Sequence, residues 1–417
     1  MKRIGLMFIL FLIILQFLPP YSFSQTETHP FILYTSEKIV AIKERLLRDP
    51  YASWFDSLIN EADTILHNNV EWGTNTIPRN TQGYYGKILA CAYVLSDPVM
   101  ENHKTYGKEA ALSIYLIPRN DYKKYFSSDL EVSEAALYWA ETYDMLKGAG
   151  FDFVVESIED MESNIRNKFS KLRDYMARDW NEGLFTSLPS IQKDFTSVAF
   201  DNGIIKVEHT DNHHVKLYAS LAALSLVIYD ESGSPEDFSR ARTRLLDILD
   251  NMTITGDNGE YAGGWAEGPN YHLYSTHEYI PVLNMFKNKN ILDYSALPEL
   301  VQTHLSLPRI VMPDGFTPPF DENEAVNFDI MGLLYSQHKT LPERDVFLWM
   351  WDLNGRIFDK AYLPDYLAQF DDTPPVYTSP EELGWNPTDF YPESGFARFR
   401  SSWDTDAIYL LFLSEHG

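Results

Sequence analysis

Helical periodicity dominates the chain from about residue 35 to about residue 355, and it limits the folds that the chain can adopt. Leu217, Leu221, Leu224 and Ile228, for example, recur at the spacing that places them on one face of a helix. Further periodic segments lie near 51–67, 82–95, 106–116, 132–143, 155–178, 236–250, 275–289, 324–337 and 342–352. Many successive helices with short connections predict a bundle, a solenoid or an (α/α) toroid. Because no sequence repeat of fixed period is visible, a toroid or an irregular bundle is favoured over a regular solenoid.

The pattern changes in the last part of the chain. Residues 371–387 contain Asp-Asp-Thr-Pro-Pro and Ser-Pro, a composition that predicts a linker. Phe396–Arg400 and Ala407–Leu413 then predict two strands separated by a turn. Because two isolated strands do not form a stable sheet, we expect residues 388–417 to be the start of an antiparallel β domain that continues beyond Gly417.

The N-terminus has the pattern of a signal peptide. Met1-Lys2-Arg3 precedes an apolar run over 4–15, and Ser22-Phe23-Ser24 supplies the small residues that a signal peptidase recognises. The apolar run is short for a bilayer span, and prolines follow it, so a membrane anchor is the weaker interpretation. We therefore expect residues 1–24 to be removed from a secreted or periplasmic protein whose helical domain covers residues 25–370.

Composition excludes some classes of partner. The formal net charge of the 417-residue chain is -26, so we expect no non-specific binding to nucleic acid or to an anionic membrane. An acidic glycan would also be repelled at long range, so a cleft that binds one must supply local positive potential. The only cysteine, Cys91, excludes an intramolecular disulfide and is expected to be a small buried side chain.

Chemically reactive side chains gather in two stretches. The first, Asp211-Asn212-His213-His214, directly precedes the Leu217 helix, so it lies at a helix N-terminus, where free N–H groups and the dipole attract carboxylates. The same dipole favours a neutral imidazole that can accept a proton. The alternative is structural: Asp or Asn caps the helix, and the histidines are solvated or pack locally.

The second stretch runs from Gly263 to Tyr274 and contains glycines, Trp265, Glu267, Pro269, Tyr271, His272 and Tyr274. Trp265 offers a flat face for a sugar ring, and Glu267 is placed to orient a cationic or imidazole group. A tyrosine becomes useful for proton transfer when a substrate is held against its oxygen. The alternative is a turn whose aromatic side chains fill the core. We expect the two stretches to face one another across a cleft.

Other segments have weaker signals. The loop containing Asp321, Glu322 and Glu324 is acidic, although Asp321 and Glu324 also fit a helix capping box. Trp72 and the Tyr84-Tyr85 pair would extend a glycan-binding cleft, but aromatic residues like these are more often part of a core. The sequence contains no Rossmann glycine motif, Walker loop, His-Glu-x-x-His, Cys-x-x-Cys or Gly-x-Ser-x-Gly.

The two stretches around Asn212 and Tyr271 resemble the heparinase II/III-like polysaccharide lyases and related alginate and heparan lyases. The resemblance rests on Asn212-His213, on Gly264–His272, and on Tyr391–Arg400 with Trp403-Asp404, which is similar to the start of the family's β-sandwich. It implies an incomplete (α/α) toroid followed by an antiparallel β-sandwich. It also implies cleavage of uronate-containing glycans, such as glycosaminoglycans or alginate, by β-elimination.

The resemblance assigns roles to individual residues. Asn212 would neutralise the substrate carboxylate with help from His213, and Tyr271 would transfer a proton to the leaving oxygen. Tyr271 and His213 are the two candidates for the base. His214 and Tyr274 are reserve candidates, and Trp265 and Glu267 are candidates for substrate binding. In the family a further His or Tyr, and often a metal site, come from the β-sandwich, so no metal or cofactor is assigned to the present span. An (α/α) glycoside hydrolase using Glu267 with Asp321 or Glu322 and a non-catalytic glycan-binding protein stay open as alternatives.

Overall fold

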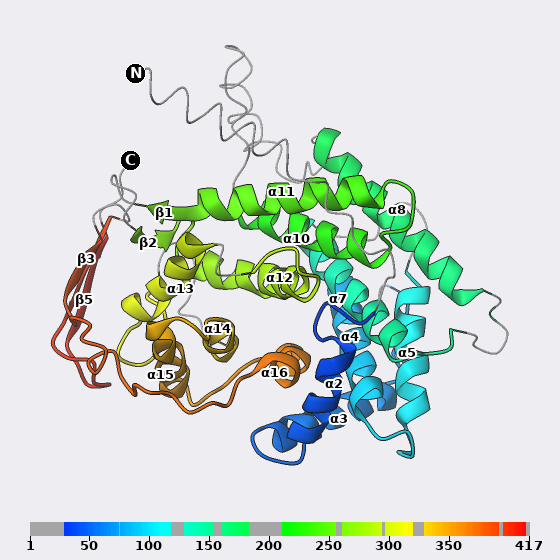
Figure 1. Cartoon of the computed structure of the whole chain (residues 1–417), viewed down its shortest axis with the longest axis horizontal. Coiled ribbons are helices and arrows are strands. Elements are labelled where there is room, and N and C mark those ends of the chain that lie inside the picture. Colours follow the sequence, from blue (N-terminus) through cyan, green and yellow to red (C-terminus); the bar gives the residue numbers. More distant parts are fainter. Residues whose placement is uncertain are drawn as a thin grey trace, which may run out of the picture.

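A computed structural model describes residues 29–74, 76–117, 129–153, 158, 160–182, 211–255, 261–293, 297–319, 329–391 and 395–413. The predicted leader, residues 1–24, lies outside the described residues. The helices are α2 (Ser36–Arg45), α3 (Tyr51–His67), α4 (Arg79–Leu95), α5 (His103–Tyr115), α7 (Asp129–Gly148), α8 (Met161–Glu182), α10 (Asn212–Val227), α11 (Ser234–Met252), α12 (Pro269–Asn288), α13 (Pro298–Ile310), α14 (Met331–Gln337), α15 (Asp345–Leu353) and α16 (Leu363–Gln369). The strands are β1 (Thr253–Thr255), β2 (Tyr261–Trp265), β3 (Asp389–Tyr391), β4 (Phe396–Arg400) and β5 (Tyr409–Leu413). The prediction of a mainly α fold is confirmed (Figure 1).

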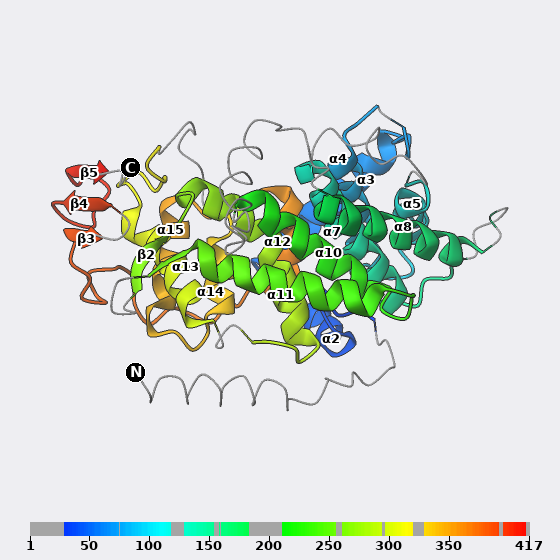
Figure 2. The same cartoon turned by 90° about the horizontal axis from the view of Figure 1, so that it is seen from above.

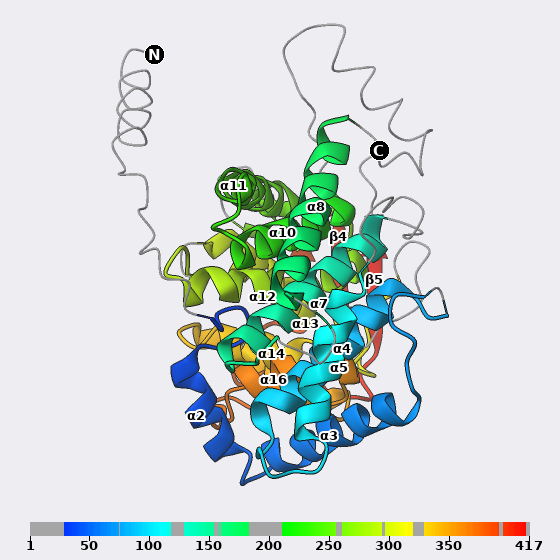
Figure 3. The ribbon, with the colours of Figure 1, turned by 90° about the vertical axis from the view of Figure 1, so that its right-hand side faces the viewer.

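An inner ring of helices forms the centre of the molecule. Along the chain, α4 packs on α7, α7 on α10 and α10 on α12, and α16 packs back on α4. The helices α5, α8 and α11 pack against this ring from outside. Figure 2 shows α11 running along the surface of the body, and Figure 3 shows α2 and α3 at the edge opposite α11. Inner helices covered by outer helices are the arrangement of an incomplete (α/α) toroid.

The helix α10 is buried on all sides because of its composition. Large apolar residues alternate with Ala219, Ala222 and Ala223, which let neighbouring helices approach closely, and nearly every side chain is buried. A helix that is apolar all round belongs in a core. In contrast, α11 is amphipathic: it buries residues such as Phe238 and Leu245 and exposes its polar face. The periodicity of the sequence therefore predicts both helices, and burial separates the inner helix from the outer one.

The inner helices begin at the same end of the ring. The backbone N–H of Arg79, at the start of α4, donates to Glu131 Oε1 in the first turn of α7 over 3.0 Å. The backbone N–H of Asn212, at the start of α10, donates to Glu267 just before α12 over 2.8 Å. Lys216 near the start of α10 also contacts Glu134 near the start of α7 at 2.8 Å, so the N-termini of α4, α7, α10 and α12 lie together.

Residues 29–34, the first that the structure describes, cover the opposite end of the helical ring. Residues 29–34 are all buried against the C-terminal parts of α7 and α12. Asp144 accepts hydrogen bonds from the backbone N–H groups of Phe31 and Ile32, both over 2.8 Å, and contacts His29 Nδ1 at 2.6 Å. Asn288, the last residue of α12, donates from Nδ2 to the carbonyl of Phe31 over 2.8 Å. Cys91, predicted to be buried, lies in this region with no exposed surface.

The C-terminal strands form a separate antiparallel sheet in the order β3-β4-β5 beside the helical body (Figure 1). The prediction of β4 and β5 is confirmed, and β3 adds a third strand that was not predicted. Arg400 donates from Nη1 to the carbonyl of Val311 over 3.0 Å, and the Tyr409 hydroxyl donates to the carbonyl of Ile310 over 2.7 Å. These bonds attach one face of the sheet to the end of α13. The β1–β2 hairpin was not predicted either, because Gly263 and Gly264 suggested an irregular connection.

Candidate functional site

Asn212 is the first residue of α10, and its side chain is 4% exposed. Asp211 caps the helix, because its Oδ1 accepts the backbone N–H of His214 over 2.9 Å. Burial works against the charged form, but the hydrogen bonds and charge of His214 hold the pKa of Asp211 below its usual value. Among the residues that the structure describes, none hydrogen-bonds the buried Asn212 Oδ1. The cap thus orders the helix end at which Asn212 lies.

Glu267 connects the two predicted stretches. Its Oε2 accepts the backbone N–H of Asn212 over 2.8 Å, and its Oε1 accepts Asn212 Nδ2 over 3.1 Å. A tight turn presents Glu267: the N–H of Gly268 bonds the carbonyl of Trp265 over 2.8 Å, and Gly268 has φ 86°, which favours glycine. Burial and the nearby Asp211 carboxylate raise the pKa of Glu267. The N-terminus of α10 and the Asn212 amide therefore already hold a carboxylate.

Tyr271 and Tyr274 lie on one side of α12, and the structure distinguishes them. The Tyr274 hydroxyl donates to Glu134 Oε1 over 3.1 Å, and burial raises the pKa of Tyr274 to about 12. Tyr271 is half-buried one turn closer to Glu267, and within the described ranges its hydroxyl makes no hydrogen bond. Tyr271 is therefore the tyrosine whose hydroxyl is available to a ligand.

The two histidines of the first stretch also differ. The Nδ1 of His214 bonds the Asp211 carboxylate, so this side chain belongs to the helix cap. His213 is half-buried in the same turn, and its charge contributes to the electrostatic environment of Glu267. The role of His213 in ligand binding stays a prediction.

The expectation for Trp265 is corrected by the structure. Its side chain is 3% exposed and stacks on His272 with the ring centroids 4.8 Å apart. A ring buried in this way has no face open to a sugar. Trp265 instead packs in the core against His272 and Tyr279, because β2 contacts α12 and α13.

A charged cluster lies one helical turn further along α10 from Asn212, and it was not predicted from the sequence. Lys216 Nζ contacts Glu134 at 2.8 Å and Glu278 at 3.1 Å and lies 3.2 Å from the centroid of the Tyr274 ring. Asn80 donates to the other oxygen of Glu134 over 2.8 Å. Burial lowers the pKa of Lys216, but Glu278 and Glu134 outweigh burial and hold it above its usual value. Burial raises the pKa of Glu278 to about 7. The sequence contains one signal for this cluster: a lysine and a glutamate lie within otherwise apolar helical segments, and buried charges of this kind require partners.

A second group lies further along α12. Tyr362, just before α16, hydrogen-bonds His277 Nδ1, and His277 Nε2 lies 3.3 Å from Asp329 Oδ1. The side chains of His277 and Asp329 are partly exposed. Together with Tyr271 and Tyr274, His277 continues the partly exposed side of α12 towards α16.

Behind this side of α12 is a buried chain of neutral imidazoles. His272 Nε2 bonds the Tyr279 hydroxyl at 3.1 Å, this hydroxyl bonds His304 Nε2 at 2.7 Å, and His304 Nδ1 bonds His338 Nε2 at 2.8 Å. Burial lowers the pKa of His272 and of His338 to about 3 and that of His304 well below its usual value. His272 thus belongs to the core.

Other predicted positions contribute less. Asp321, Glu322 and Glu324 lie outside the described residues, so the paired-carboxylate geometry of the hydrolase alternative stays a prediction. Trp72 donates from Nε1 to Glu109 over 2.8 Å. Among the described residues no three His, Cys, Asp or Glu side chains converge as metal ligands would. The described residues therefore offer no set of ligands for the metal that the resemblance implies, and no step of the proposed reaction uses it.

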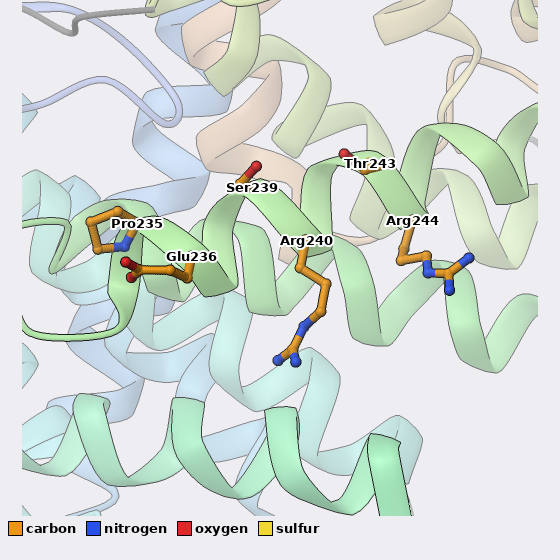
Figure 4. A pocket seen from close by; sticks show the side chains of 6 residues that line it. All are labelled: Pro235, Glu236, Ser239, Arg240, Thr243 and Arg244. Carbon is orange, nitrogen blue, oxygen red and sulfur yellow. The ribbon is translucent and has the colours of Figure 1, made fainter. Parts of the chain in front are cut away.

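A surface groove of about 550 Å³ lies elsewhere, along the outer face of α11 (Figure 4). It is lined by Pro235, Glu236, Ser239, Arg240, Thr243 and Arg244. Arg240 is paired with Asp237 at 2.8 Å, so its charge is balanced within α11. None of the described helices combines the length and the apolar character that a membrane crossing requires.

No family model and no curated protein matches the chain. Among solved structures it is similar to the heparan sulfate lyase HepC from Pedobacter heparinus, with 14% identity over 90% of this chain and 55% of that chain and a TM-score of 0.47. It is also similar to a heparinase III, with 12% identity over 96% and 56% and a TM-score of 0.41. An alginate lyase from Bacteroides ovatus matches with 12% identity over 84% and 98% and a TM-score of 0.37. The chain spans about half the length of the heparinase structures. Likeness at this level does not identify functional residues, so the function below is argued from the site itself.

Proposed function

We propose that the chain is a polysaccharide lyase that cleaves a uronate-containing glycan by β-elimination at Asn212, His213 and Tyr271. The observation that carries the proposal is the pair of hydrogen bonds from Asn212 N–H and Nδ2 to the Glu267 carboxylate. A helix N-terminus and a buried amide that bind one carboxylate are suited to bind a second one beside it. Nδ2 carries two hydrogens, and one of them is enough for Glu267.

Elimination requires such a carboxylate site. The proton on C5 of a uronic acid becomes acidic when charge can spread into the neighbouring carboxylate as an enolate. Donors aimed at the carboxylate oxygens stabilise that charge, and in a partly buried site they act more strongly than in water. Asn212, at the positive end of α10, supplies this stabilisation in the proposal.

Proton transfer is assigned to His213 and Tyr271. His213, or Tyr271 as its phenolate, removes the C5 proton, the electron pair of the C5–H bond forms the C4–C5 double bond, and the C4–O bond breaks. The leaving oxygen takes a proton from the Tyr271 hydroxyl. Tyr274 and His214 are poorer candidates, because their polar atoms are bound to Glu134 and Asp211 respectively.

The net charge and the leader pattern bear on the substrate and on where the protein acts. The substrate in this proposal is an acidic polysaccharide, drawn from glycosaminoglycans or alginate. Because the chain carries a formal net charge of -26, attraction must come from local donors and not from the overall field. The leader pattern at residues 1–24 supports action outside the cytoplasm, in the periplasm or the medium.

The test is the ultraviolet absorbance of the unsaturated uronate product. The intact protein is mixed with a panel of uronate polymers, and absorbance is followed together with the release of reducing ends. We expect both signals to grow for at least one polymer and Tyr271→Phe to lose about 10²–10⁴-fold in rate. Tyr274→Phe is the matched control and should retain most of the activity, since its hydroxyl is already bound to Glu134.

The alternatives predict different outcomes. Reducing ends released without the ultraviolet signal would replace the lyase proposal with a hydrolase. Polymer binding without turnover, unchanged in Tyr271→Phe, would indicate a glycan-binding protein. A complete lack of response across the panel would refute the proposal.

A further inference from the structure

Glu267 contacts Asn212 with both carboxylate oxygens. One oxygen accepts the backbone N–H over 2.8 Å, and the other accepts the side-chain Nδ2 over 3.1 Å. The turn between β2 and α12 fixes the position from which Glu267 reaches across, through the Gly268–Trp265 hydrogen bond. Glu267 therefore does more than cap a helix, because one of its oxygens is committed to a side chain.

A carboxamide has two orientations that occupy the same volume. In one orientation the NH₂ group faces Glu267, and in the other the carbonyl oxygen does. The second orientation would place Asn212 Oδ1 against a carboxylate oxygen, two acceptors without a proton between them. The backbone N–H of Asn212 offers no alternative partner for Oε1, since it is already bound to Oε2. The charge on Glu267 therefore selects the orientation with Nδ2 towards Glu267.

We propose that Glu267 is a positioning residue that fixes the orientation of the Asn212 carboxamide, so that the second hydrogen on Nδ2 is presented to the substrate carboxylate. This inference rests on the proposed function of Asn212. Glu267 does not touch the reacting atoms and acts through Asn212 alone. It differs from a residue that merely joins α10 to α12, because that role needs only the backbone N–H.

Two charged or titratable groups surround Glu267 from the neighbouring helix end. Asp211 is the N-cap of α10, and His213 lies in its first turn. When Glu267 takes up a proton, one of its oxygens becomes a donor and no longer accepts Nδ2, so the selection of the amide orientation is lost. Activity should therefore fall at acid pH as Glu267 takes up a proton. Burial raises the pKa of Glu267, so this loss of activity should begin at a higher pH than it would for an exposed glutamate.

The variant that tests this role is Glu267→Gln. It has almost the same shape, but one oxygen is replaced by an NH₂ group that pairs best with Asn212 Oδ1, which favours the opposite amide orientation. We expect kcat/KM to fall by about 10²–10³-fold, mainly through kcat, as for loss of one aligned donor. The acid limb of the pH profile should become less steep in this variant, since the Glu267 carboxyl no longer contributes to it and only the proposed base does. Glu236→Gln, exposed on α11, is the matched control and should keep the parental rate and profile.

A double-mutant cycle separates positioning from a structural role. Asn212→Ala keeps the backbone N–H that Glu267 binds, but it removes the carboxamide. If Glu267 acts through the carboxamide, Glu267→Gln has little further effect on rate in the Asn212→Ala background. Equal fold losses in both backgrounds, or an unchanged acid limb in Glu267→Gln, would overturn the proposal.

The same cycle can be measured without catalysis. The urea midpoints of the parent, the two single variants and the double variant report whether the two side chains are coupled in the folded protein. A parent that is inactive on every polymer refutes the proposed function, whereas additive shifts in midpoint refute the contact between Glu267 and the carboxamide. The two failures are thus distinguishable.

Discussion

Replacing His338 with glutamine should make the protein less sensitive to acid. His338 ends the buried chain that runs through His304 and Tyr279, and burial lowers its pKa to about 3. The unfolded imidazole takes up a proton below about pH 6.5, whereas the folded one does not. The stability associated with neutral His338 is therefore fully present above about pH 6.5 and is lost as the pH falls towards 3.

The magnitude follows from this difference in protonation. One proton taken up only on unfolding changes the free energy of unfolding by about 1.4 kcal/mol per pH unit. Between about pH 7.5 and about pH 5, His338 should cost the parent about 2 kcal/mol that His338→Gln does not lose. Glutamine is suitable because its amide can pair with His304 Nδ1 and does not titrate. Other buried groups that titrate in this range, such as Glu278, are common to both proteins and cancel in the difference.

Urea unfolding at the two pH values measures the effect. The difference in unfolding free energy between His338→Gln and the parent should move by about 2 kcal/mol in favour of the variant at the lower pH. His67→Gln, at an exposed position of α3, is the control and should follow the parent. Parallel pH curves for His338→Gln and the parent would refute the reasoning, because they would mean that His338 binds the same number of protons in both states.

Three further predictions concern buried side chains. Lys216→Met removes the partner of the buried Glu278 carboxylate and of the partly buried Glu134, and it should lower the unfolding free energy by about 3–5 kcal/mol in urea titrations; adding Glu278→Gln should restore part of it, and no restoration would contradict the ion-pair explanation. The Cys91 thiol should react with a maleimide only when the protein is unfolded, so labelling of the native protein at the rate of a free thiol would be a contrary result. Leu224→Ala inside α10 should cost about 2–5 kcal/mol, whereas Val99→Ala at an exposed position should change stability by less than about 0.5 kcal/mol.

The helical body could be predicted because long helices leave a strong pattern. The Leu217–Ile228 pattern coincides with α10, apart from its capping residues, and the 51–67 segment coincides with α3. Short strands leave a weak pattern: β3 has three residues, and the glycines in β2 suggested a loop. Three residues are too few to establish an alternation of apolar and polar positions.

The candidate site was predicted in part. The expectation that the Asn212 and Glu267 stretches meet agrees with their hydrogen bonds, but which atoms meet depends on the turn at Gly268, whose geometry has no sequence period. The Lys216–Glu278 pair was not predicted, because its members lie on different helices and their register is set by packing. Trp265 was misassigned for a related reason: a strand decides which way a side chain points, and the strand was not recognised.

The burial of residues 29–34 affects the order in which the protein can be completed. Phe31 is bound by Asn288, 257 residues later in the chain, and its N–H is bound by Asp144, 113 residues later. During translation this apolar segment therefore exists for most of the synthesis without the surfaces that receive it. Contacts between such distant segments slow folding and leave apolar surface open to chaperones or to aggregation. A nascent chain stalled before α12 would have α7 but not Asn288, so its first segment could make only part of its final contacts.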